Sequence, residues 1–424
     1  MPTLEYQTAG ESHGPTLLCT ITGLPAGLSL DMDLINGELR RRQGGWGRGG
    51  RQSLETDVAD FVTGVRLGKT TGAPVTALVK NKDSRLDDLK RTPPVHRPRP
   101  GHADLPGSIK WLTTDCRETL ERASARETAA RTVGGAVAKC LLKSIGVEVF
   151  GFVRQILDAG TDVEVTADNW RDMLAARDAS EVYCPDAEAS ARQKEIITQA
   201  KVDRDTVGGL VEAHVFGLPP GIGSCMDWRD KLDARIAYAV LGIQAFKACE
   251  IGLGREAGAR RGSAVHDPIH YDASKSNENH LGFVRTSNNA GGTEGGMTNG
   301  MPVVVTGTMK PIATIRKGLP SVDLNTKEPE QSQYERSDVC AISAASVVME
   351  NAVAFEVARA ALTKFGGDTM VEFKDNIERF MANARLLPLD PPETVMACTR
   401  RFESCFGLSA SRSRTRAVWF CSHL

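Results

Sequence analysis

Apolar and polar positions alternate over short segments of this chain and recur at helical spacing over longer ones. The apolar segment 17–21 and the β-branched run 75–80 are predicted strands, since Gly-Leu-Pro follows the first and Gly-Ala-Pro precedes the second. Residues 339–362 are rich in alanine and predict a long, buried helix. Residues 117–145 predict another, because apolar side chains recur every four residues at Val133, Val137, Leu141 and Ile145.

This order of elements occurs twice. Ile-Thr-Gly-Leu-Pro-Ala-Gly-Leu at 21–28 returns as Val-Phe-Gly-Leu-Pro-Pro-Gly-Ile at 215–222, and a helical pattern follows each copy, from about Asp31 and about Met226. The Gly-x-Pro opening of the run 71–80 returns in Asn-Gly-Met-Pro-Val-Val-Val-Thr, and the two long helices form a third pair. One such similarity is expected by chance, whereas three in the same order indicate two related halves.

The repeat defines the expected domain organisation. Residues 1–380 are expected to form one domain with two halves, about 1–205 and 206–380, that meet at a pseudo-twofold seam. Residues 381–424 are expected to be a C-terminal tail outside the two halves, and this segment is rich in arginine, serine and unpaired cysteine.

The strand pattern also predicts the fold class. The strands near the Gly-Leu-Pro turns are half-buried rather than continuously apolar, which favours antiparallel sheet covered by helices over a Rossmann sheet. We therefore predict an α+β fold. No Gly-x-Gly-x-x-Gly follows a predicted strand, which argues against a tightly held nicotinamide cofactor.

Composition narrows the class of protein. The 424 residues include 52 basic and 53 acidic side chains, for a net charge of −1, and the pI is near 6.7. A nucleic-acid-binding protein usually has a broad basic face and a higher pI, so we expect no nucleic-acid partner. The weakly polar segment 339–362 is interrupted by Glu350, Glu356 and Arg359, so we expect no membrane span.

The cysteines and the N-terminus suggest a location. The ten cysteines are scattered without a Cys-x-x-Cys pair, which indicates free thiols in a reducing compartment. The first residues lack the basic-then-apolar pattern of a signal peptide. We expect a soluble, cytoplasmic protein.

Positive charge is concentrated between residues 40 and 51. The sequence Arg-Arg-Arg-Gln-Gly-Gly-Trp-Gly-Arg-Gly-Gly-Arg contains five arginines and five glycines. Arginine offers paired donors to carboxylates and phosphates, and glycine lets the backbone approach a ligand. A solvated surface run and an Arg-Gly-Gly nucleic-acid arm are the alternatives. On a protein of nearly zero net charge, a local site for a small anionic molecule is the favoured interpretation.

Two histidines are candidates for acid–base chemistry. His13 lies in Gly-Glu-Ser-His-Gly just before a predicted strand, where packing gives no reason for it. His102 follows Arg-Pro-Arg-Pro-Gly in a loop stiffened by prolines, where the alternative is a surface histidine. His266 and His270 are separated by Pro268, which disfavours helical ligand spacing, so we expect no metal site.

Further candidates lie on the long helices and in the second half. Arg126 follows small residues that would let a flat ring pack closely, although a salt bridge on an ordinary helix face is the alternative. The glycine-rich segment 287–296 leads towards Lys310, and its backbone N–H groups suit a phosphate. Asp338 is expected to begin the second long helix, either as its cap or as a site residue beside Arg336.

Together these motifs resemble those of the chorismate synthase family. Gly-Glu-Ser-His-Gly, Arg-Pro-Gly-His-Ala-Asp, Ser-Ala-Arg-Glu-Thr-Ala, Asn-x-Ala-Gly-Gly-x-x-Gly-Gly and Arg-Ser-Asp follow one another in the family's order. The resemblance extends from about Tyr6 to Ile377, and the arginine–glycine loop is similar to that of the bacterial subgroup. Trp46 stands where a tyrosine is expected.

The resemblance implies an activity and an architecture. The family converts 5-enolpyruvylshikimate 3-phosphate to chorismate by anti-1,4-elimination of phosphate, the last step of the shikimate pathway. It needs reduced FMN although the reaction has no net redox change, and NAD(P)H reduces the flavin in some members. The implied fold is a β-α-β sandwich assembled as a homotetramer.

The resemblance also implies roles for individual residues. His13 would transfer a proton near flavin and substrate, His102 would protonate or hydrogen-bond the departing phosphate, and Asp338 would assist proton removal at flavin N5. The substrate's anionic groups would be held by Arg42, Arg48, Arg51, Arg126 and Arg336.

The implied cofactor site draws on both halves. Arg42 and Arg48 would also meet NADPH where a member reduces its own flavin. The remaining flavin contacts would come from Arg122, Ala123, Ser124, Gln244, Ala245, Gly295, Lys310, Pro311, Ile312, Ala313, Thr314 and Arg336.

Two other functions fit parts of this sequence. A flavin reductase that uses NAD(P)H on a phosphorylated metabolite would need similar cations. An RNA-binding protein would use the Arg-Gly-Gly sequence instead.

Overall fold

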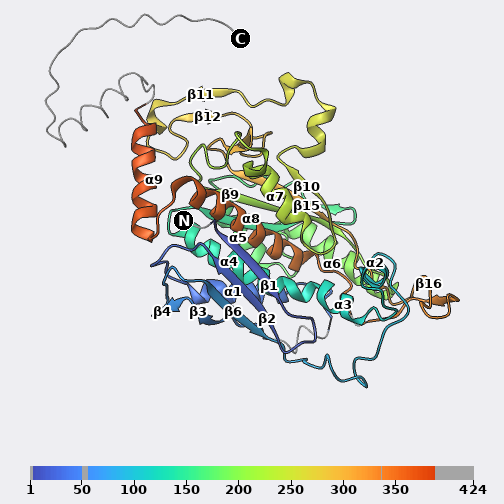
Figure 1. The fold of residues 1–424 in the computed structure, drawn as a ribbon. Coiled ribbons are helices and arrows are strands. Elements are labelled where there is room, and N and C mark those ends of the chain that lie inside the picture. The colour runs from blue at the N-terminus through green and yellow to red at the C-terminus, as the bar shows by residue number, and fades with distance from the viewer. Residues whose placement is uncertain (1–2, 50–55, 336, 387–424) are drawn as a thin grey trace, which may run out of the picture. The chain divides into compact units, whose positions relative to one another are not determined.

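The computed structural model describes residues 3–49, 56–335 and 337–386. Within them, two antiparallel sheets enclose a layer of helices (Figure 1). The first sheet contains, in spatial order, β1 (Glu5–Ala9), β2 (Thr16–Thr22), β6 (Val75–Lys80) and β3 (Asp60–Thr63). The second contains β10 (Phe246–Ile251), β15 (Val303–Met309), β9 (Gly209–Phe216), β7 (Glu148–Ile156) and β8 (Ala159–Gly160).

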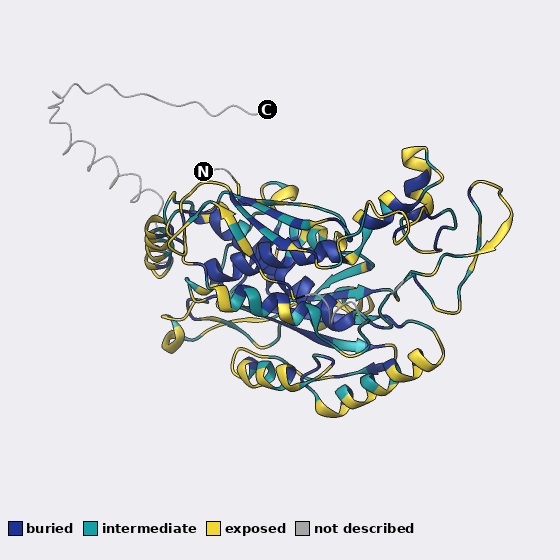
Figure 2. Cartoon of the chain, turned by 90° about the horizontal axis from the view of Figure 1, so that it is seen from below, coloured by how far each residue is buried: buried dark blue, intermediate teal, exposed yellow. Residues whose placement is uncertain are grey.

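Four helices fill the space between the sheets: α1 (Met32–Gln43), α4 (Thr128–Lys143), α7 (Leu232–Leu241) and α8 (Ile342–Phe365). Helix α4 packs on β2 and β6, α8 packs on β7 and β9, and the two helices pack against each other. A Cβ added to Gly135 would lie 2.4 Å from Asn351, so glycine is required where α4 and α8 cross. Figure 2 shows the buried residues concentrated in this layer. The predicted α+β fold and its sandwich architecture are confirmed.

The remaining elements lie around this sandwich. The helices are α2 (Asp104–Trp111), α3 (Arg117–Ala123), α5 (Trp170–Ala179), α6 (Ala187–Val202) and α9 (Met370–Ala384). The short strands are β4 (Val65–Arg66), β5 (Lys69–Thr70), β11 (Ile269–Tyr271), β12 (Phe283–Arg285), β13 (Thr293–Glu294), β14 (Met297–Thr298), β16 (Pro320–Val322) and β17 (Pro329–Gln331). No helix among the described residues is long and apolar enough to cross a membrane.

The two sheets repeat one topology. In chain order, β1, β2, α1, β3, β6 and α4 correspond to β7, β9, α7, β10, β15 and α8, and each set of four strands has the same order in its sheet. The Gly-Leu-Pro turns after β2 and β9 adopt the same backbone: φ is 79° at Gly23 and 82° at Gly217, and 85° at Gly27 and 84° at Gly221. Glycine tolerates such positive φ without strain, which explains why the turn sequence is repeated.

The strand pairing favours a division between the halves other than the expected one near residue 205. Strand β7 precedes residue 205 but pairs with β9 in the second sheet. We therefore propose that the halves divide between α4 and β7, because the segment 148–205 belongs to the second set of strands and its insertions. Residues up to Met381 form one compact unit, and the tail from residue 387 lies outside the described residues.

The predicted helix at 117–145 is interrupted. Helix α3 ends at Ser124, whose backbone is extended (φ −62°, ψ 141°), and a short 3-10 turn over Ala125–Glu127 precedes α4. The Ser124 hydroxyl accepts a hydrogen bond from the N–H of Arg126. A serine side chain can replace a helical hydrogen bond in this way, so the apolar periodicity was right for α4 but missed the break.

A buried charge network joins the helices of the central layer. The carboxylate of Glu350 on α8 lies 2.8 Å from Arg41 on α1, 2.5 Å from Lys139 on α4 and 3.4 Å from Arg177 on α5. Glu38 on α1 accepts from Arg41 and Lys139 at 2.7 and 3.0 Å. Burial alone would raise the pKa of Glu350, but Arg41 and Lys139 outweigh it and lower that pKa. The network therefore remains charged.

Removing the carboxylate at its centre should destabilise the fold. We expect Glu350→Ala to lower the free energy of unfolding by roughly 3–5 kcal/mol, because the buried Lys139 and Arg177 and the partly buried Arg41 would lose their shared partner. The control is Glu181→Ala: Glu181 pairs with Lys194 but is 58% exposed, and its loss should cost less than about 1 kcal/mol. Denaturant unfolding of both variants measures the difference, and equal losses would contradict this account.

Candidate functional site

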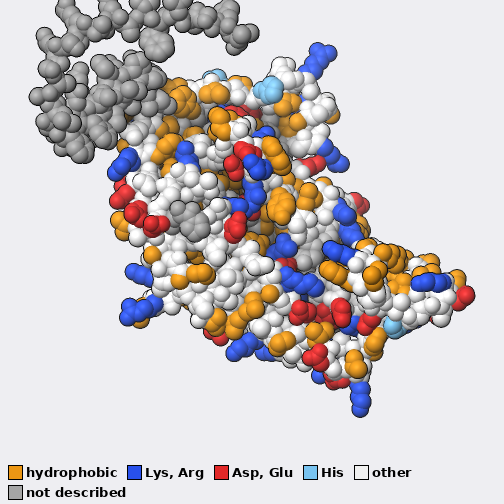
Figure 3. Space-filling view, in the orientation of Figure 1, with side chains coloured by type: hydrophobic (Ala, Val, Ile, Leu, Met, Phe, Trp, Pro, Cys, Tyr) orange, Lys and Arg blue, Asp and Glu red, His pale blue; other side chains and the backbone are white. Residues whose placement is uncertain are grey.

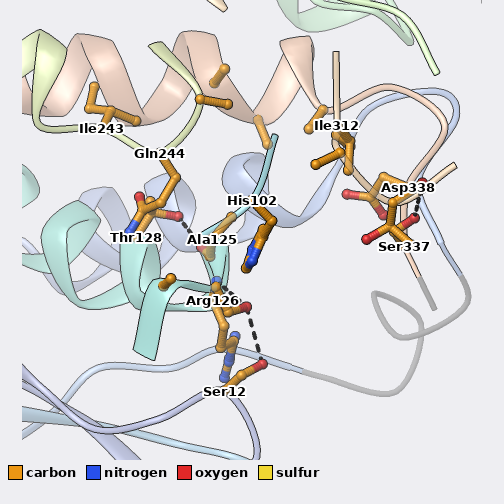
Figure 4. A pocket seen from close by; sticks show the side chains of 18 of the residues that line it. Ser12, His102, Ala125, Arg126, Thr128, Ile243, Gln244, Ile312, Ser337 and Asp338 are labelled. Carbon is orange, nitrogen blue, oxygen red and sulfur yellow. Dashed lines mark hydrogen bonds between the residues drawn. The ribbon is translucent and has the colours of Figure 1, made fainter. Parts of the chain in front are cut away.

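A cavity of about 570 Å³ lies between the two halves, a size typical of small-molecule sites. Its walls come from segments far apart in the sequence (Figure 4). The first half supplies the turn before β2, the end of α1, the loop before α2 and the break between α3 and α4. The second half supplies the turn before β10, the segment after β15 and the first turns of α8.

The two sides of the cavity differ in chemistry. Ile243, Ile312 and Val348, together with alanines of α8, form an apolar side. Histidines and arginines, among them His13, His102, Arg42, Arg48 and Arg126, form the other side. An apolar surface suits a flat ring, and clustered arginines suit an anion. The cavity is therefore equipped to hold both at once.

Arg42 and Arg126 share one buried carboxylate. Asp57 Oδ2 lies 2.6 Å from Arg126 Nη1 and 3.5 Å from Arg42 Nη1. Arg42 also donates to Thr128 Oγ1 at 2.9 Å and to the Ala125 carbonyl at 2.8 Å. Burial, with repulsion from nearby arginines, lowers the pKa of Arg42, although Asp57 opposes this. Adding an anion would relieve that repulsion.

Some buried polar atoms of the arginine cluster lack hydrogen-bond partners. Among the described residues, Nη1 of Arg42, Nε of Arg48 and Oδ1 of Asp57 are buried without one. Two of these atoms are cationic donors beside the cavity. Since an unpaired buried donor costs free energy, they favour an acceptor-rich ligand.

Arg48 is paired with Asp338. Nη1 of Arg48 lies 2.8 Å from Asp338 Oδ2, and the backbone N–H of Gly49 donates to Oδ1 at 2.6 Å. The expectation that Asp338 begins the second long helix is wrong, and so is its alternative role as the helix cap, because α8 begins only at Ile342 and its N-cap residue is Ala341. Asp338 instead connects the arginine–glycine loop to the cavity.

The described part of that loop, residues 44–49, is held by α6 and by the turn before it. The backbone N–H of Trp46 donates to the Glu181 carbonyl at 2.8 Å, and its indole N–H donates to Thr198 at 3.2 Å. Lys194 Nζ lies 4.1 Å from the centre of the Trp46 ring, within the range of a cation–π contact. The side chain of Trp46 thus anchors the loop outside the cavity. The indole N–H contributes the hydrogen bond to Thr198.

Trp46 should control access of proteases to this loop. We expect Trp46→Ala to increase the rate of tryptic cleavage after Arg48, because the loop would lose its contacts with α6. Trp111→Ala, which removes a 61% exposed indole from α2, is the control and should leave this cleavage unchanged. Mass spectrometry of early fragments measures both, and unchanged cleavage in Trp46→Ala would contradict the anchoring role.

Both candidate histidines line the cavity. His13 Nδ1 lies 2.9 Å from the Glu121 carboxylate, and its Nε2 lies 3.2 Å from Arg85 Nη2. His102 Nδ1 lies 2.5 Å from Asp104 Oδ1. The structure therefore brings together two histidines that are 89 positions apart in the sequence.

Most residues expected to bind flavin also line the cavity: Ala123, Ser124, Gln244, Ala245, Lys310, Ile312, Ala313 and Thr314. Lys310 Nζ donates to the Gly101 carbonyl. The side-chain N–H of Gln244 donates to Glu127 at 3.0 Å, while its Oε1 is buried without a partner among the described residues. An orphaned acceptor of this kind favours a ligand with a ring N–H.

Three of the expected flavin contacts lie elsewhere. Arg122 donates to the carbonyls of Thr8 and Gly10; neither its side chain nor Pro311 lines the cavity. Gly295 lies in the turn between β13 and β14, and it does not line the cavity either. Arg51 and Arg336 lie outside the described residues.

In the segment 287–296, which is expected to suit a phosphate, two backbone N–H groups already have partners. The backbone N–H groups of Asn289 and Ala290 donate to the Asp267 carboxylate at 2.8 and 2.9 Å. Because these two N–H groups already donate to a carboxylate of the same chain, they are not free to donate to a phosphate. His266 and His270 join no metal-binding cluster, and no group of three His, Cys, Asp or Glu among the described residues could hold a metal.

Sequence reasoning assigned no role in the site to several of its polar residues. Ser12, Arg85, Arg99 and Glu121 all line the cavity, and Ser12 receives a hydrogen bond from Ser124 at 3.2 Å, drawn in Figure 4. Ser12 adjoins His13, so the motif Gly-Glu-Ser-His-Gly could have indicated it as a site residue. Glu121 is 108 positions from His13, and no local pattern connects the two.

Comparisons with known proteins show which family this chain is similar to. A family model described as chorismate synthase matches residues 4–362. The chain is 50% identical to "Chorismate synthase" of Geobacter sulfurreducens over 392 residues, covering 90% of this chain and 99% of the relative. It is 47% identical to the protein of the same name from Desulforudis audaxviator, covering 90% and 98%. A solved structure titled "Crystal Structure of Chorismate Synthase" has a TM-score of 0.73 at 37% identity, covering 91% of this chain and 99% of that one.

Proposed function

The chain belongs to the chorismate synthase family, and we propose that it eliminates phosphate from 5-enolpyruvylshikimate 3-phosphate to give chorismate. The observation that supports this most directly is the cavity itself, in which Arg42, Arg48 and Arg126 meet His13 and His102 opposite an apolar side. The substrate carries one phosphate and two carboxylates, so several arginines are needed to balance it. This anti-1,4-elimination makes the protein a carbon–oxygen lyase.

The arginines would bind the substrate and stabilise the leaving phosphate. Charge grows on the phosphate oxygen as the C–O bond breaks, and fixed cations in a site shielded from water stabilise it most effectively. Arg42 and Arg126 are held by Asp57 before the substrate arrives. Arg48 would exchange its contact with Asp338 for a contact with the substrate. Arg51 and Arg336 are proposed to add to this anion site.

The proton transfers are assigned to three side chains. His102 would protonate or hydrogen-bond the departing phosphate, since it lies beside cations on the loop before α2. His13 and Asp338 would exchange protons near the cofactor ring. All three side chains line the same cavity, as a shared reaction centre requires.

The cavity fits a flavin. Ile243, Ile312 and Val348 offer a surface for a planar ring, and the orphaned Oε1 of Gln244 offers an acceptor. The residues proposed to hold FMN are Ala123, Ser124, Gln244, Ala245, Lys310, Ile312, Ala313 and Thr314, with Arg122, Gly295, Pro311 and Arg336 retained from the resemblance. When bound, reduced FMN supplies electron density that assists loss of phosphate without net redox change.

Assembly and location follow from the same resemblance. We propose a cytoplasmic homotetramer, and exposed aromatic side chains on and near α7, such as Tyr238 and Trp228, offer contact area for other subunits. NAD(P)H is proposed as the reductant of the flavin, near Arg42 and Arg48. The site needs no nucleic acid. On the face shown in Figure 3, cationic and anionic side chains are interspersed rather than gathered in a basic patch.

An anaerobic assay of the full chain tests the proposed reaction. With photoreduced FMN and 5-enolpyruvylshikimate 3-phosphate, phosphate and chorismate should form over many turnovers without loss of reduced flavin. Stoichiometric consumption of reductant would support a flavin reductase instead. If neither phosphate is released nor reductant consumed, the proposal is overturned and RNA binding becomes the favoured alternative.

Arg48 should contribute mainly to substrate binding. We expect Arg48→Ala to raise KM for the substrate roughly 10- to 100-fold, the range for losing a hydrogen bond between charged groups. The Kd for FMN should change much less, because the proposed flavin contacts lie mostly in the second half. Arg229→Ala, at an exposed arginine of the second half (70% exposed), is the control. Equal changes in KM and in the Kd for FMN would show that Arg48 does not act mainly in substrate binding.

A further inference from the structure

Each histidine of the cavity contacts a fully buried carboxylate through Nδ1. The side chains of Asp104 and Glu121 have no exposed surface, whereas the rings of His102 and His13 are 21% and 12% exposed. Neither carboxylate belongs to the acid–base groups assigned above. The shared arrangement raises the question of what each carboxylate does for its ring.

Asp104 is held rigidly as an acceptor. It lies at the start of α2 and accepts from the backbone N–H of Arg99 at 3.0 Å and from its Nε at 2.8 Å. Arg99 in turn donates from Nη1 to Thr314 Oγ1 at 2.8 Å. Burial would raise the pKa of Asp104, but hydrogen bonds from His102 and Arg99 lower it. An ionised carboxylate can only accept, so the proton between Asp104 and His102 belongs to Nδ1.

Glu121 holds His13 in the same way. Its carboxylate accepts from the backbone N–H of His13 at 2.9 Å as well as contacting Nδ1. Arg117, one turn earlier on α3, lies 3.4 Å from the same carboxylate. Burial acts to raise the pKa of Glu121, but the hydrogen bond from His13 acts in the opposite direction, and the pKa is lowered overall. Here too the proton must lie on Nδ1 of the ring.

We propose that Asp104 and Glu121 are positioning residues that fix His102 and His13 as Nδ1–H tautomers and so make Nε2 the nitrogen that exchanges protons with the cavity. The proposal rests on the proposed function and adds two residues to its proton-transfer machinery. The hydrogen bond at one ring nitrogen decides which nitrogen remains reactive.

The surroundings of Nε2 give the two rings different roles. At His13, Arg85 Nη2 is 3.2 Å from Nε2 and donates to it, while Asp83 lies 3.8 Å away. This ring therefore donates from Nδ1 to Glu121 and accepts at Nε2 from Arg85. At His102, the charged neighbours are Asp104, Arg99 and Lys310, which contacts the backbone at Gly101. Asp104 is the counter-charge for a protonated ring.

The proton transfer at His102 is then balanced. The Nε2–H bond breaks, and the proton joins an oxygen of the departing phosphate, which keeps the electron pair of the broken C–O bond. The ring returns to the neutral Nδ1–H form and remains hydrogen-bonded to Asp104. Arg99 Nη2 is only 3.0 Å from Nδ1, so without Asp104 it would donate there and force the neutral ring into the Nε2–H form.

A matched pair elsewhere in the fold provides the control. His214 on β9 lies 2.7 Å from Glu212, and both side chains are buried among the strands of the second sheet, outside the cavity. Glu212→Gln removes a buried carboxylate from a histidine of no proposed catalytic role. It should leave kcat and KM near the parent values even where it lowers stability.

Double-mutant cycles on the full chain with reduced FMN test the proposal. Asp104→Ala should lower kcat on the order of 10²-fold or more with a small change in KM, as expected for lost general acid catalysis. In a His102→Ala background the same substitution should cost almost nothing further, because Asp104 acts through that ring. Glu121→Ala should behave likewise with His13→Ala. Additive losses in either cycle would overturn the proposal for that pair.

A second measurement needs no turnover. In protein with ¹⁵N-labelled histidine, the ring nitrogen shifts of neutral His102 and His13 should report Nδ1–H in the parent. Asp104→Ala should convert His102 to the Nε2–H form and leave His13 unchanged, and Glu121→Ala should do the reverse. An Nε2–H tautomer in the parent would refute the positioning role. Correct tautomers in a protein without lyase activity would refute only the proposed function.

Discussion

Burial of charge between the two sheets is the constraint on which the site depends. Glu350 fixes Arg41 at the end of α1, and the next residue, Arg42, points to the cavity. The buried carboxylate of Glu350 needs a cationic partner, and this requirement holds the partly buried Arg41 in position. Because the two arginines are adjacent on one helix, the charge network of the core also sets the position of an anion-binding side chain.

The same rule applies around the cavity. Arg126 is matched by Asp57, Arg48 by Asp338 and Arg99 by Asp104. These carboxylates hold the guanidinium groups in place before a substrate binds, which reduces the reorganisation needed during the reaction. They also leave orphaned donors on Arg42 and Arg48. The site is therefore ordered by its own acids yet still has donors to offer an anion.

The duplicated topology explains where this site lies. Each half places a helix on one face of its sheet, and the two helical faces pack together. The cavity occurs where the break at Ser124 in the first half meets the start of α8 in the second. Ala123, Ser124, Ala125 and Arg126, which lie at this interruption, all line the cavity.

The sequence by itself determined the α+β class, the repeat, the turns at Gly23 and Gly217, and the motifs bearing His13, His102 and Arg42, because these depend on local periodicity and on backbone conformations that few residues adopt. Only the tertiary structure decided which charges meet. Asp57 and Glu121 look like ordinary surface acids in the sequence, and Glu350 interrupts a helix predicted to be buried. Each has a partner far away in the sequence: Arg126, His13 and Arg41 lie 69, 108 and 309 positions from them. Pairing across such distances depends on how helices and sheets pack, and no local pattern records it.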